Sequence, residues 1–318
     1  MFTEVRAQGE NARLPDRTRR MPTNSIPTGY CGTLRCSLTP QVEVRPLSRQ
    51  EGFVDAIADL DVPDAETARK LSIKVLPSTT PYVLVQYRTR IGSVREFDGA
   101  CHNHGQYGHI ASYVRCGVAN VRAFGPVGVV VVRLRPEAAP RILGSGMDAF
   151  ANVKIGLSDI LERRRMSVLE EQVAEARTSV ERVALVTDFL RANMRERDPD
   201  PLVSWAAAQL RHKPVRIRLL AEELGISERH LSRRFRAVFG ISPKEFARTA
   251  RLEKVLVARA AGLAWADLSY ACGFADQAHM INDTRRILGA SPEQILAPPL
   301  TGQRGDLGAS DGTPLFMW

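Results

Sequence analysis

The residues of this sequence with the clearest chemistry are imidazoles and thiols that lie close together. Cys101, His102, His104, His109 and Cys116 fall within 16 residues. Imidazole and thiolate suit zinc or iron, and a His-x-His pair on a β-barrel can hold a metal. However, no carboxylate follows at ligand spacing, and glycines at 105 and 108 are typical of a loop. We therefore expect a polar loop without a metal, and keep the metal site as the alternative.

The segments around this cluster have the composition of short strands. They are rich in β-branched residues, and Pro and Gly separate them, as in turns between strands. Several short strands of this kind predict a small β-barrel or sandwich. The predicted strands cover 73–76, 82–87, 117–124 and 127–134, and a short helix follows Pro136 and ends at Gly144.

A change of period divides the chain in two. Between about 158 and 195, apolar residues recur at helical spacing with charges between them. The Asp198-Pro-Asp-Pro201 segment ends this stretch, because proline lacks a backbone N–H and restricts the residue before it. Residues 202–297 are predicted to be almost entirely helical. The fold class is therefore α+β, with a strand-rich domain at 46–197 ahead of an all-α domain at 202–297.

Both ends of the chain have a different composition. Residues 1–45 are rich in Arg, Pro, Thr and Gly, and residues 298–318 contain Gly and Pro. Neither segment has a clear period, so we expect a flexible N-terminal segment and a flexible tail.

The positive charge is concentrated in the all-α domain. The 318 residues carry a formal net charge of +9. Residues 202–297 hold 15 Lys and Arg against 9 Asp and Glu, which is +6 of that total. A basic excess in one domain favours a polyanionic partner, either nucleic acid or an anionic surface.

Composition argues against a membrane protein and against a secreted one. No apolar stretch approaches the roughly 18 residues of a membrane span, and no apolar segment follows the N-terminal arginines. The cysteines are odd in number and irregularly spaced, which does not suit a disulfide framework. We therefore expect reduced thiols and a cytoplasmic location.

The last third of the chain repeats itself once. Leu224-Gly225 is echoed by Cys272-Gly273, 48 residues later. Phe239-Gly-Ile-Ser-Pro243 is echoed by Leu288-Gly-Ala-Ser-Pro292, 49 residues later. Two copies are too few for a solenoid, so they indicate a pair of related small units.

The first copy has the residue order of a helix, a tight turn and a second helix. Residues 219–224 form the first helix, Gly225 permits a left-handed turn, and Ser227 caps the second helix. On that second helix, apolar residues recur at i, i+4 and i+8 and form one face: Leu231, Phe235 and Phe239.

The second copy follows the same order with a turn one residue longer. Residues 265–272 form its first helix, Gly273 the turn, and Asp276 the cap of a helix over 277–288. After each copy, a glycine stops the helix and a capping box starts another one. These boxes are Ser242-Pro-Lys-Glu245 and Ser291-Pro-Glu-Gln294.

This region resembles the DNA-binding module of the AraC/XylS family of bacterial transcriptional regulators. The resemblance runs from about Val215 to Leu296 and implies two helix-turn-helix subdomains joined by a helix from Pro243 to about Ala261. It implies double-stranded DNA and RNA polymerase as partners, and leaves open an activator or a repressor. It is strongest at Leu220-Ala-Glu-Glu-Leu-Gly-Ile-Ser227, His230-Leu-Ser-Arg-Arg-Phe235, Gly240-Ile-Ser-Pro243, Arg251-Leu252 and Ala271-Cys-Gly-Phe274.

The resemblance also assigns roles to residues on the two recognition helices. Arg can hold guanine through two hydrogen bonds, and Gln or Asn can hold adenine. Residues later on the same helices are assigned to phosphate. The base contacts are Arg229, Ser232, Arg233, Gln277, Ala278 and Asn282, and the phosphate contacts are Arg236 and Arg285.

The second unit departs from the family at four positions. The family usually has aromatic residues where this chain has Met280 and Thr284, Arg where it has Asn282, and Ala where it has Ser269. At position 284 a hydroxyl replaces a large apolar group, which weakens a small core. We therefore expect the second helix to read bases less strongly than the first.

The region 46–197 is similar, more loosely, to the cupin-like sensor domain that precedes this module in some family members. The similarity lies mainly in the strand from Gly125 to Pro136 and in the helices after it. It implies a small-molecule effector or a homodimer, and no cofactor. The helix predicted at 167–195 packs either between two protomers or against its own barrel.

The leading interpretation is a sequence-specific, effector-responsive transcriptional regulator without catalytic activity. The sequence has no glycine-rich phosphate loop and no convincing nucleophile–base arrangement. One alternative is a cupin-type metal-binding protein or enzyme with a helical appendage, which only the His-x-His pair supports. The other is a non-specific architectural DNA binder.

Overall fold

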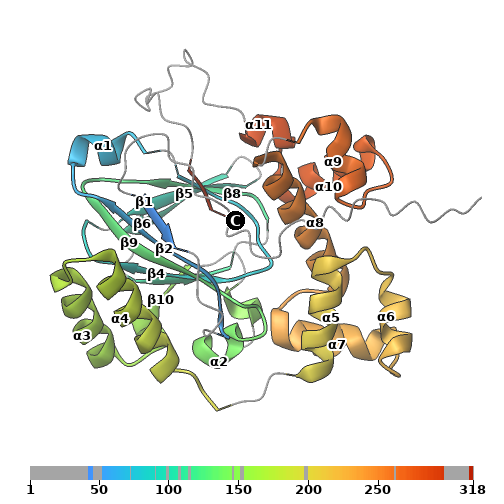
Figure 1. Cartoon of the computed structure of the whole chain (residues 1–318), viewed down its shortest axis with the longest axis horizontal. Helices are drawn as coiled ribbons and strands as arrows, with labels where there is room; N and C mark the ends of the chain where they lie inside the picture. The colour runs from blue at the N-terminus through green and yellow to red at the C-terminus, as the bar shows by residue number, and fades with distance from the viewer. Residues whose placement is uncertain are drawn as a thin grey trace, which may run out of the picture. The chain divides into compact units, whose positions relative to one another are not determined.

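The computed structural model describes the chain in ranges separated by gaps. Two sheets and a set of helices fill these ranges, with a mixed α and β composition as predicted (Figure 1). No helix within them has the length and apolarity for a bilayer crossing. The ranges are 42–45, 52–71, 73–89, 91–97, 100–106, 109–113, 116–144, 147–150, 154–196, 200–260, 263–296 and 315–317.

The first sheet has six strands in the order β1-β2-β9-β4-β7-β10, and every neighbouring pair is antiparallel. Its longest pairing is between β2 and β9, which are joined from Val54↔Leu134 to Val62↔Val127. The strands are β1 (Val42–Arg45), β2 (Val54–Val62), β4 (Tyr82–Gln86), β7 (Ile110–Ser112), β9 (Val127–Leu134) and β10 (Lys154–Gly156).

The second sheet has five strands in the order β11-β3-β8-β5-β6. β11 pairs with β3 in parallel, and the other pairs are antiparallel. Among the described residues neither sheet closes on itself, so closure into a barrel stays a prediction. The strands are β3 (Ile73–Val75), β5 (Gly92–Phe97), β6 (Ala100–Gln106), β8 (Val118–Arg122) and β11 (Leu315–Met317).

The valine run of β9 is explained by burial on both of its faces. Successive side chains of a strand point to opposite faces. Val127, Val129 and Val131 belong to one apolar cluster, with residues of β3, β4 and β8. The alternate residues of β9, from Val130 to Leu134, belong to a second cluster that includes residues of the helices. A strand buried on both faces needs apolar residues at nearly every position, which is the pattern here.

Four predicted strands are confirmed, and two segments differ from expectation. The loop predicted around residues 101–116 contains β6 and β7, because β6 pairs with β5 through partners such as Arg95↔His102. Pairing with the preceding strand outweighs the local preference of glycine and histidine for loops. Two short strands, β1 and β11, also lie inside the end segments that we expected to be flexible. The rest of those segments lies outside the described residues.

The helical stretch predicted at 158–195 is two helices rather than one. They are α3 (Arg163–Glu175) and α4 (Ser179–Ala192). The break follows from a capping box, in which Thr178 accepts a hydrogen bond from the backbone N–H of Glu181, and Glu181 accepts from that of Thr178. α4 packs on β2 and β9, so this helix pair lies against its own sheet (Figure 1).

A buried ion pair holds α4 on that sheet. Arg182 Nε lies 2.9 Å from the Asp59 carboxylate on β2, and both side chains are buried. The Tyr87 hydroxyl donates to the same carboxylate at 2.7 Å. Burial has the largest effect on the pKa of Tyr87 and this hydrogen bond the next largest, and both raise it. The hydroxyl therefore stays protonated and can donate.

The remaining helices include the short helix that was predicted after Pro136 and the helical C-terminal part. The helix α2 (Ala139–Leu143) ends at Gly144 in a left-handed conformation, as expected. Figure 1 shows α8 running between two groups of helices. The other helices are α1 (Ala65–Arg69), η1 (Met147–Phe150), η2 (Leu157–Asp159), α5 (Pro201–His212), α6 (Ile217–Glu223), α7 (Glu228–Phe239), α8 (Pro243–Ala260), α9 (Trp265–Ala271), α10 (Gln277–Leu288) and α11 (Pro292–Leu296).

The connection between β3 and β4 is bound to α8 through one carboxylate. Ser78 Oγ donates to Glu253 Oε1 at 2.6 Å, and the backbone N–H of Thr79 donates to the same oxygen at 2.9 Å. Thr79 Oγ1 donates to Glu253 Oε2 at 2.8 Å. Arg133 on β9 lies 4.0 Å from this carboxylate. Three hydrogen bonds and a nearby positive charge thus compensate the desolvation of Glu253.

An apolar cluster adjoins this contact. It joins Leu76 and Val118 of the strand-rich part to α8 and α10, through Leu252, Leu256, Ile287 and Leu288. The backbone N–H of Gly117 also donates to the carbonyl of Ile287 at 2.8 Å. The strand-rich part therefore covers these four apolar residues of α8 and α10.

We expect Glu253→Ala to destabilise the protein. The change leaves the buried hydroxyl of Thr79 and its backbone N–H without their acceptor, which should lower the free energy of unfolding by about 1–3 kcal/mol. Urea denaturation of the full chain measures it. The matched control is Glu222→Ala, which removes an exposed (i, i+4) ion pair with Arg218 and should cost about 0.5 kcal/mol or less. Equal losses in the two variants would contradict the assigned role of Glu253.

Candidate nucleic-acid interface

The first helix pair is α6 and α7, joined by a turn with a defined hydrogen-bond pattern. The N–H of Gly225 donates to the carbonyl of Glu222, and that of Ile226 donates to the carbonyl of Ala221, both at 3.0 Å. This is the Schellman motif, which requires a left-handed residue after the helix. Gly225 has φ +67°, while a Cβ there would meet open space, so the backbone conformation alone favours glycine.

The second recognition unit, α9 and α10, has the same turn. The N–H of Gly273 donates to the carbonyl of Tyr270 at 3.1 Å, and that of Phe274 to the carbonyl of Ser269 at 2.9 Å. Gly273 has φ +76°. Four residues separate the first pair of helices and five the second, as predicted. The repeat in the sequence is therefore a repeat in structure.

The predicted caps are confirmed in both units. Ser227 accepts a hydrogen bond from the backbone N–H of His230 at 3.2 Å, and Asp276 accepts one from that of His279 at 2.7 Å. The capping boxes that begin α8 and α11 are present too. Left-handed glycines end both recognition helices, at positions 240 and 289.

Three phenylalanines form the core of the first unit. Phe235 and Phe239 on α7 pack with Phe246 on α8, with ring centroids 4.5–5.3 Å apart. All three are almost completely buried, together with Leu231, which confirms the predicted apolar face of α7. Aromatic contacts at these distances give a rigid, well-filled core.

The core of the second unit is smaller and more varied. Met280 and Thr284 on α10 are both buried, in the places where the family usually has aromatic residues. The hydroxyl of Thr284 donates to the carbonyl of Met280 at 2.8 Å, so the polar group is satisfied inside the helix. Burial raises the pKa of the Cys272 thiol to about 11, so this cysteine packs beside Met280 as a neutral group.

The predicted DNA-facing residues of α7 lie on one exposed stripe. Arg229, Arg233 and Arg236 stand at i, i+4 and i+7, opposite the buried face, and Ser232 lies beside them, half-buried. No ion pair joins these three arginines to another described residue. Their donors are therefore available to a ligand.

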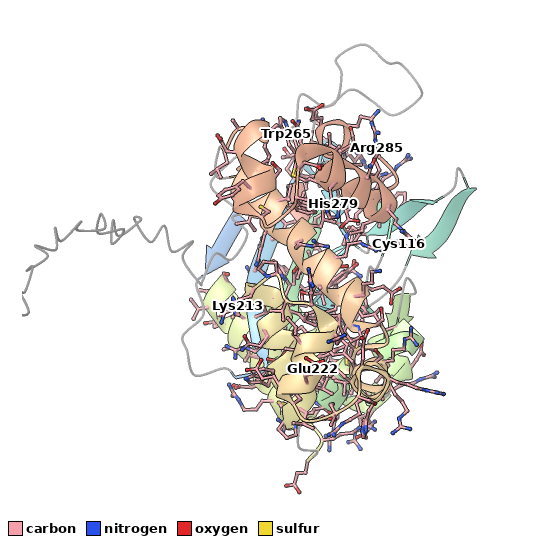
Figure 2. All side chains as sticks on the ribbon, turned by 90° about the vertical axis from the view of Figure 1, so that its right-hand side faces the viewer. Cys116, Lys213, Glu222, Trp265, His279 and Arg285 are labelled. Carbon is pink, nitrogen blue, oxygen red and sulfur yellow. The ribbon has the colours of Figure 1, made fainter. Side chains whose placement is uncertain are left out.

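α10 presents the corresponding stripe. An offset of 49 residues, the spacing of the two caps, places Ala278 at the position of Arg229, Asn282 at that of Arg233 and Arg285 at that of Arg236. These residues and Gln277 are exposed. Figure 2 shows Arg285 on the second unit and Glu222 on the first, with α8 running from one to the other. The structure thus places the predicted residues on matched stripes that differ in charge.

Two ion-pair groups that support these helices were not predicted. Arg234 on α7 binds Asp200 through two contacts of 2.7 Å, and Asp200 also caps α5. The sequence signal was the Asp-Pro start of α5, which predicts the cap and not its partner.

On α10, Asp283 makes the second group. It lies 3.4 Å from Arg248 and 3.2 Å from Arg251, both on α8, and 3.6 Å from His279. These contacts hold α10 against α8 from the side opposite its exposed stripe. They fix the orientation of the helix without using the residues of that stripe.

The candidate metal ligands are only partly within the described residues. Among the side chains that the structure describes, no group of three or more His, Cys, Asp or Glu is placed to hold a metal ion. The side chains of Cys101, His102 and His104 lie outside them. His109 Nδ1 accepts a hydrogen bond from the backbone N–H of Gln86 at 3.0 Å, and its Nε2 lies 3.6 Å from Glu170 on α3. The imidazole thus joins β4 to α3.

A known family model matches the C-terminal part of the chain. It is described as a helix-turn-helix domain and matches residues 220–297. No curated protein matches the sequence.

Several solved structures match this chain at low sequence identity, each with a TM-score below 0.5. An apo form of ToxT from Vibrio cholerae is 12% identical, covers 76% of this chain and 96% of its own, and has a TM-score of 0.43. Wild-type ToxT from Vibrio cholerae with a bound unsaturated fatty acid is 11% identical, with coverages of 78% and 96% and a TM-score of 0.41. The AraC-like transcriptional activator CuxR is 14% identical, with coverages of 67% and 86% and a TM-score of 0.24.

The family match and the geometry agree on the same residues. Two helix pairs with the same Schellman turn, matched caps and matched exposed stripes lie in the range that the helix-turn-helix model covers, apart from the first residues of α6. The C-terminal part of this chain is therefore a helix-turn-helix domain built from two helix-turn-helix units, and it is similar to the DNA-binding domains of AraC-type transcriptional regulators.

Proposed function

We propose that the chain regulates transcription by reading two successive major grooves of one DNA site, with α7 in the first and α10 in the second. The observation that carries this proposal is the pair of exposed stripes at matched positions of the two helices. Arg229, Ser232 and Arg233 contact bases in the first groove. Gln277, Ala278 and Asn282 contact bases in the second, and Arg236 and Arg285 contact phosphates.

The length of α8 supports simultaneous binding. At 1.5 Å per residue, its 18 residues span about 27 Å. Successive major grooves on one face of the duplex are roughly 34 Å apart. α7 packs at the start of α8, on Phe246, and α10 packs farther along it, beside Leu252 and Leu256, so α8 holds the two recognition helices apart. The DNA site then consists of two short blocks about 10 base pairs apart.

The strand-rich part supplies regulation in this proposal. We assign it as a cupin-like sensor domain, in which the two sheets belong to one small barrel, that binds a small-molecule effector and can form a homodimer. RNA polymerase is the proposed partner of the DNA-bound protein, in the cytoplasm. The contacts of α8 and α10 with residues 76–79 and 117–118 give the sensor a physical route to the recognition helices.

The decisive experiment is selection of bound sequences from random double-stranded DNA with the full chain. A specific regulator enriches a site of two blocks, and binds it at least about 10³-fold more tightly than scrambled DNA. Both affinities should fall steeply with salt concentration, because each phosphate neutralised by Arg or Lys releases counterions. Salt-dependent binding without an enriched site would instead identify a non-specific architectural protein.

We expect the two recognition helices to contribute unequally. Arg233→Ala removes a side chain that can hold guanine by two hydrogen bonds, so it should cost about 1–3 kcal/mol of binding and relax the preference in the first block. Asn282→Ala, at the matched position of α10, should cost clearly less. Affinities of both variants on matched and scrambled sites measure the difference.

The control for this comparison is Arg164→Ala. Arg164 is exposed on α3, far along the chain from both stripes, so its loss should leave the preference within the first block unchanged. If Asn282→Ala proves as damaging as Arg233→Ala, then the assignment of α10 as the weaker reader is wrong.

A further inference from the structure

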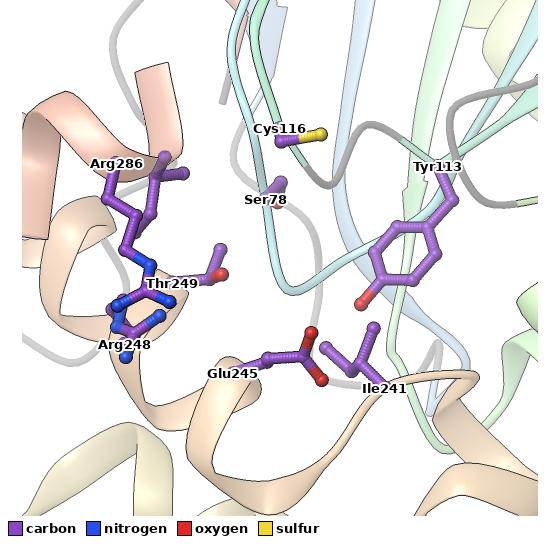
Figure 3. Close-up of a pocket in the computed structure, with 9 residues that line it drawn as sticks. Ser78, Tyr113, Cys116, Ile241, Glu245, Arg248, Thr249 and Arg286 are labelled. Carbon is purple, nitrogen blue, oxygen red and sulfur yellow. The ribbon is translucent and has the colours of Figure 1, made fainter. Parts of the chain in front are cut away.

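A polar pocket lies where the strand-rich part meets the two helix-turn-helix units. Its volume is about 350 Å³, at the lower end of the range for small-molecule sites. Figure 3 shows its walls, with Arg248 and Arg286 on one side and Tyr113 on the other. The lining residues are Ser78, Tyr113, Cys116, Ile241, Glu245, Arg248, Thr249, Arg286 and Ile287.

The walls come from three parts of the chain that matter for DNA binding. Ser78 and Tyr113 belong to the strand-rich part, and Ser78 also donates to Glu253 on α8. Ile241 directly follows α7 and its terminal Gly240. Arg286 belongs to the last turn of α10. A molecule in this pocket therefore touches the supports of both recognition helices at once.

Among the charged side chains that line the pocket, the guanidinium of Arg286 has no ion-pair partner among the described residues. Arg248 is paired with Asp283, at 3.4 Å, and Arg251 shares that carboxylate. Glu245 Oε2 accepts hydrogen bonds from the backbone N–H and the hydroxyl of Ser242, so this oxygen is used by the helix cap. Arg286 is exposed, and no ion pair or hydrogen bond joins it to another described residue.

These features select the chemistry of an occupant. A guanidinium presents donors in a planar fork that matches a carboxylate. The side chains of Ile241 and Ile287 offer apolar surface for a short carbon skeleton, which inorganic phosphate lacks. Hydroxyl groups of Thr249 and Tyr113 complete a lining that is too polar and too small for a long alkyl chain.

We infer that this pocket binds a small organic carboxylate, such as a short mono- or dicarboxylic acid, and that Arg286 holds its carboxylate. The inference deepens the proposed function, because it assigns the effector class and a place where the effector acts. The bound acid joins α10 to the residues around Ser78. The acid changes the affinity of the protein for DNA only if it binds the DNA-bound and the DNA-free protein with different affinities. DNA then changes the affinity of the protein for the acid by the same factor.

The test uses the full chain with butyrate, succinate and citrate as probes, and with inorganic phosphate and the uncharged butyramide as comparisons. Thermal unfolding is followed at increasing probe concentration, in the absence of DNA. At least one of the three acids should raise the unfolding temperature saturably, whereas butyramide and phosphate should not. Arg286→Gln should weaken the binding of that acid by about tenfold or more, because a hydrogen bond between charged groups is lost.

Arg164→Gln is the matched control, since it removes one exposed positive charge elsewhere and should leave the affinity for the acid unchanged. No stabilisation by the three acids, equal loss in both variants, or stabilisation by phosphate alone would overturn the assignment. The same acid is then added to the complex with the selected DNA site, where a changed affinity supports an effector and an unchanged one overturns that role. DNA binding without acid reports on the proposed function separately.

Discussion

The contact between Glu253 and the β3–β4 connection is the constraint on which the placement of both helix-turn-helix units depends. α8 packs against helices of both units, so a contact that fixes α8 on the strand-rich part also fixes where both units lie on it. The adjoining apolar cluster favours proximity, but apolar burial is non-directional and does not by itself set a register. Three hydrogen bonds to one carboxylate do set it, because they weaken steeply when distance or angle changes.

The local features of the site could be predicted from the sequence because their causes lie within a few residues. A helix cap needs Ser or Asp three positions before the backbone N–H that donates to its side chain, as at Ser227 and Asp276. A Schellman turn needs a residue that tolerates positive φ, as at Gly225 and Gly273. The long-range polar contacts that support the site could not be predicted. Arg234 finds Asp200 across 34 residues and Ser78 finds Glu253 across 175, and nothing local selects these partners.

The strand-rich part also contains strands that could be predicted from the sequence and one that could not. A run such as Val129–Val132 predicts a strand buried on both faces, and β9 is one. β6 was missed because its composition, with two histidines and a glycine, is typical of a loop, and only its pairing with β5 makes it a strand. The barrel expected from the number of strands depends on how the two sheets meet, which the period of the sequence does not encode.

The difference between the two recognition helices lies in the chemistry of their stripes more than in their support. Thr284 satisfies its hydroxyl within α10, and Asp283 ties the same helix to two arginines of α8, so the lost aromatic residues are partly offset by polar contacts. The stripe itself offers Asn282 and Ala278 where α7 offers two arginines. A helix with fewer strong donors contributes less to binding, yet α10 is the one whose last turn, with Arg286, lines the pocket. In our proposal, an effector bound in this pocket acts on the recognition helix that binds DNA less strongly. A modest change in free energy is then a larger share of the free energy that holds this helix on DNA.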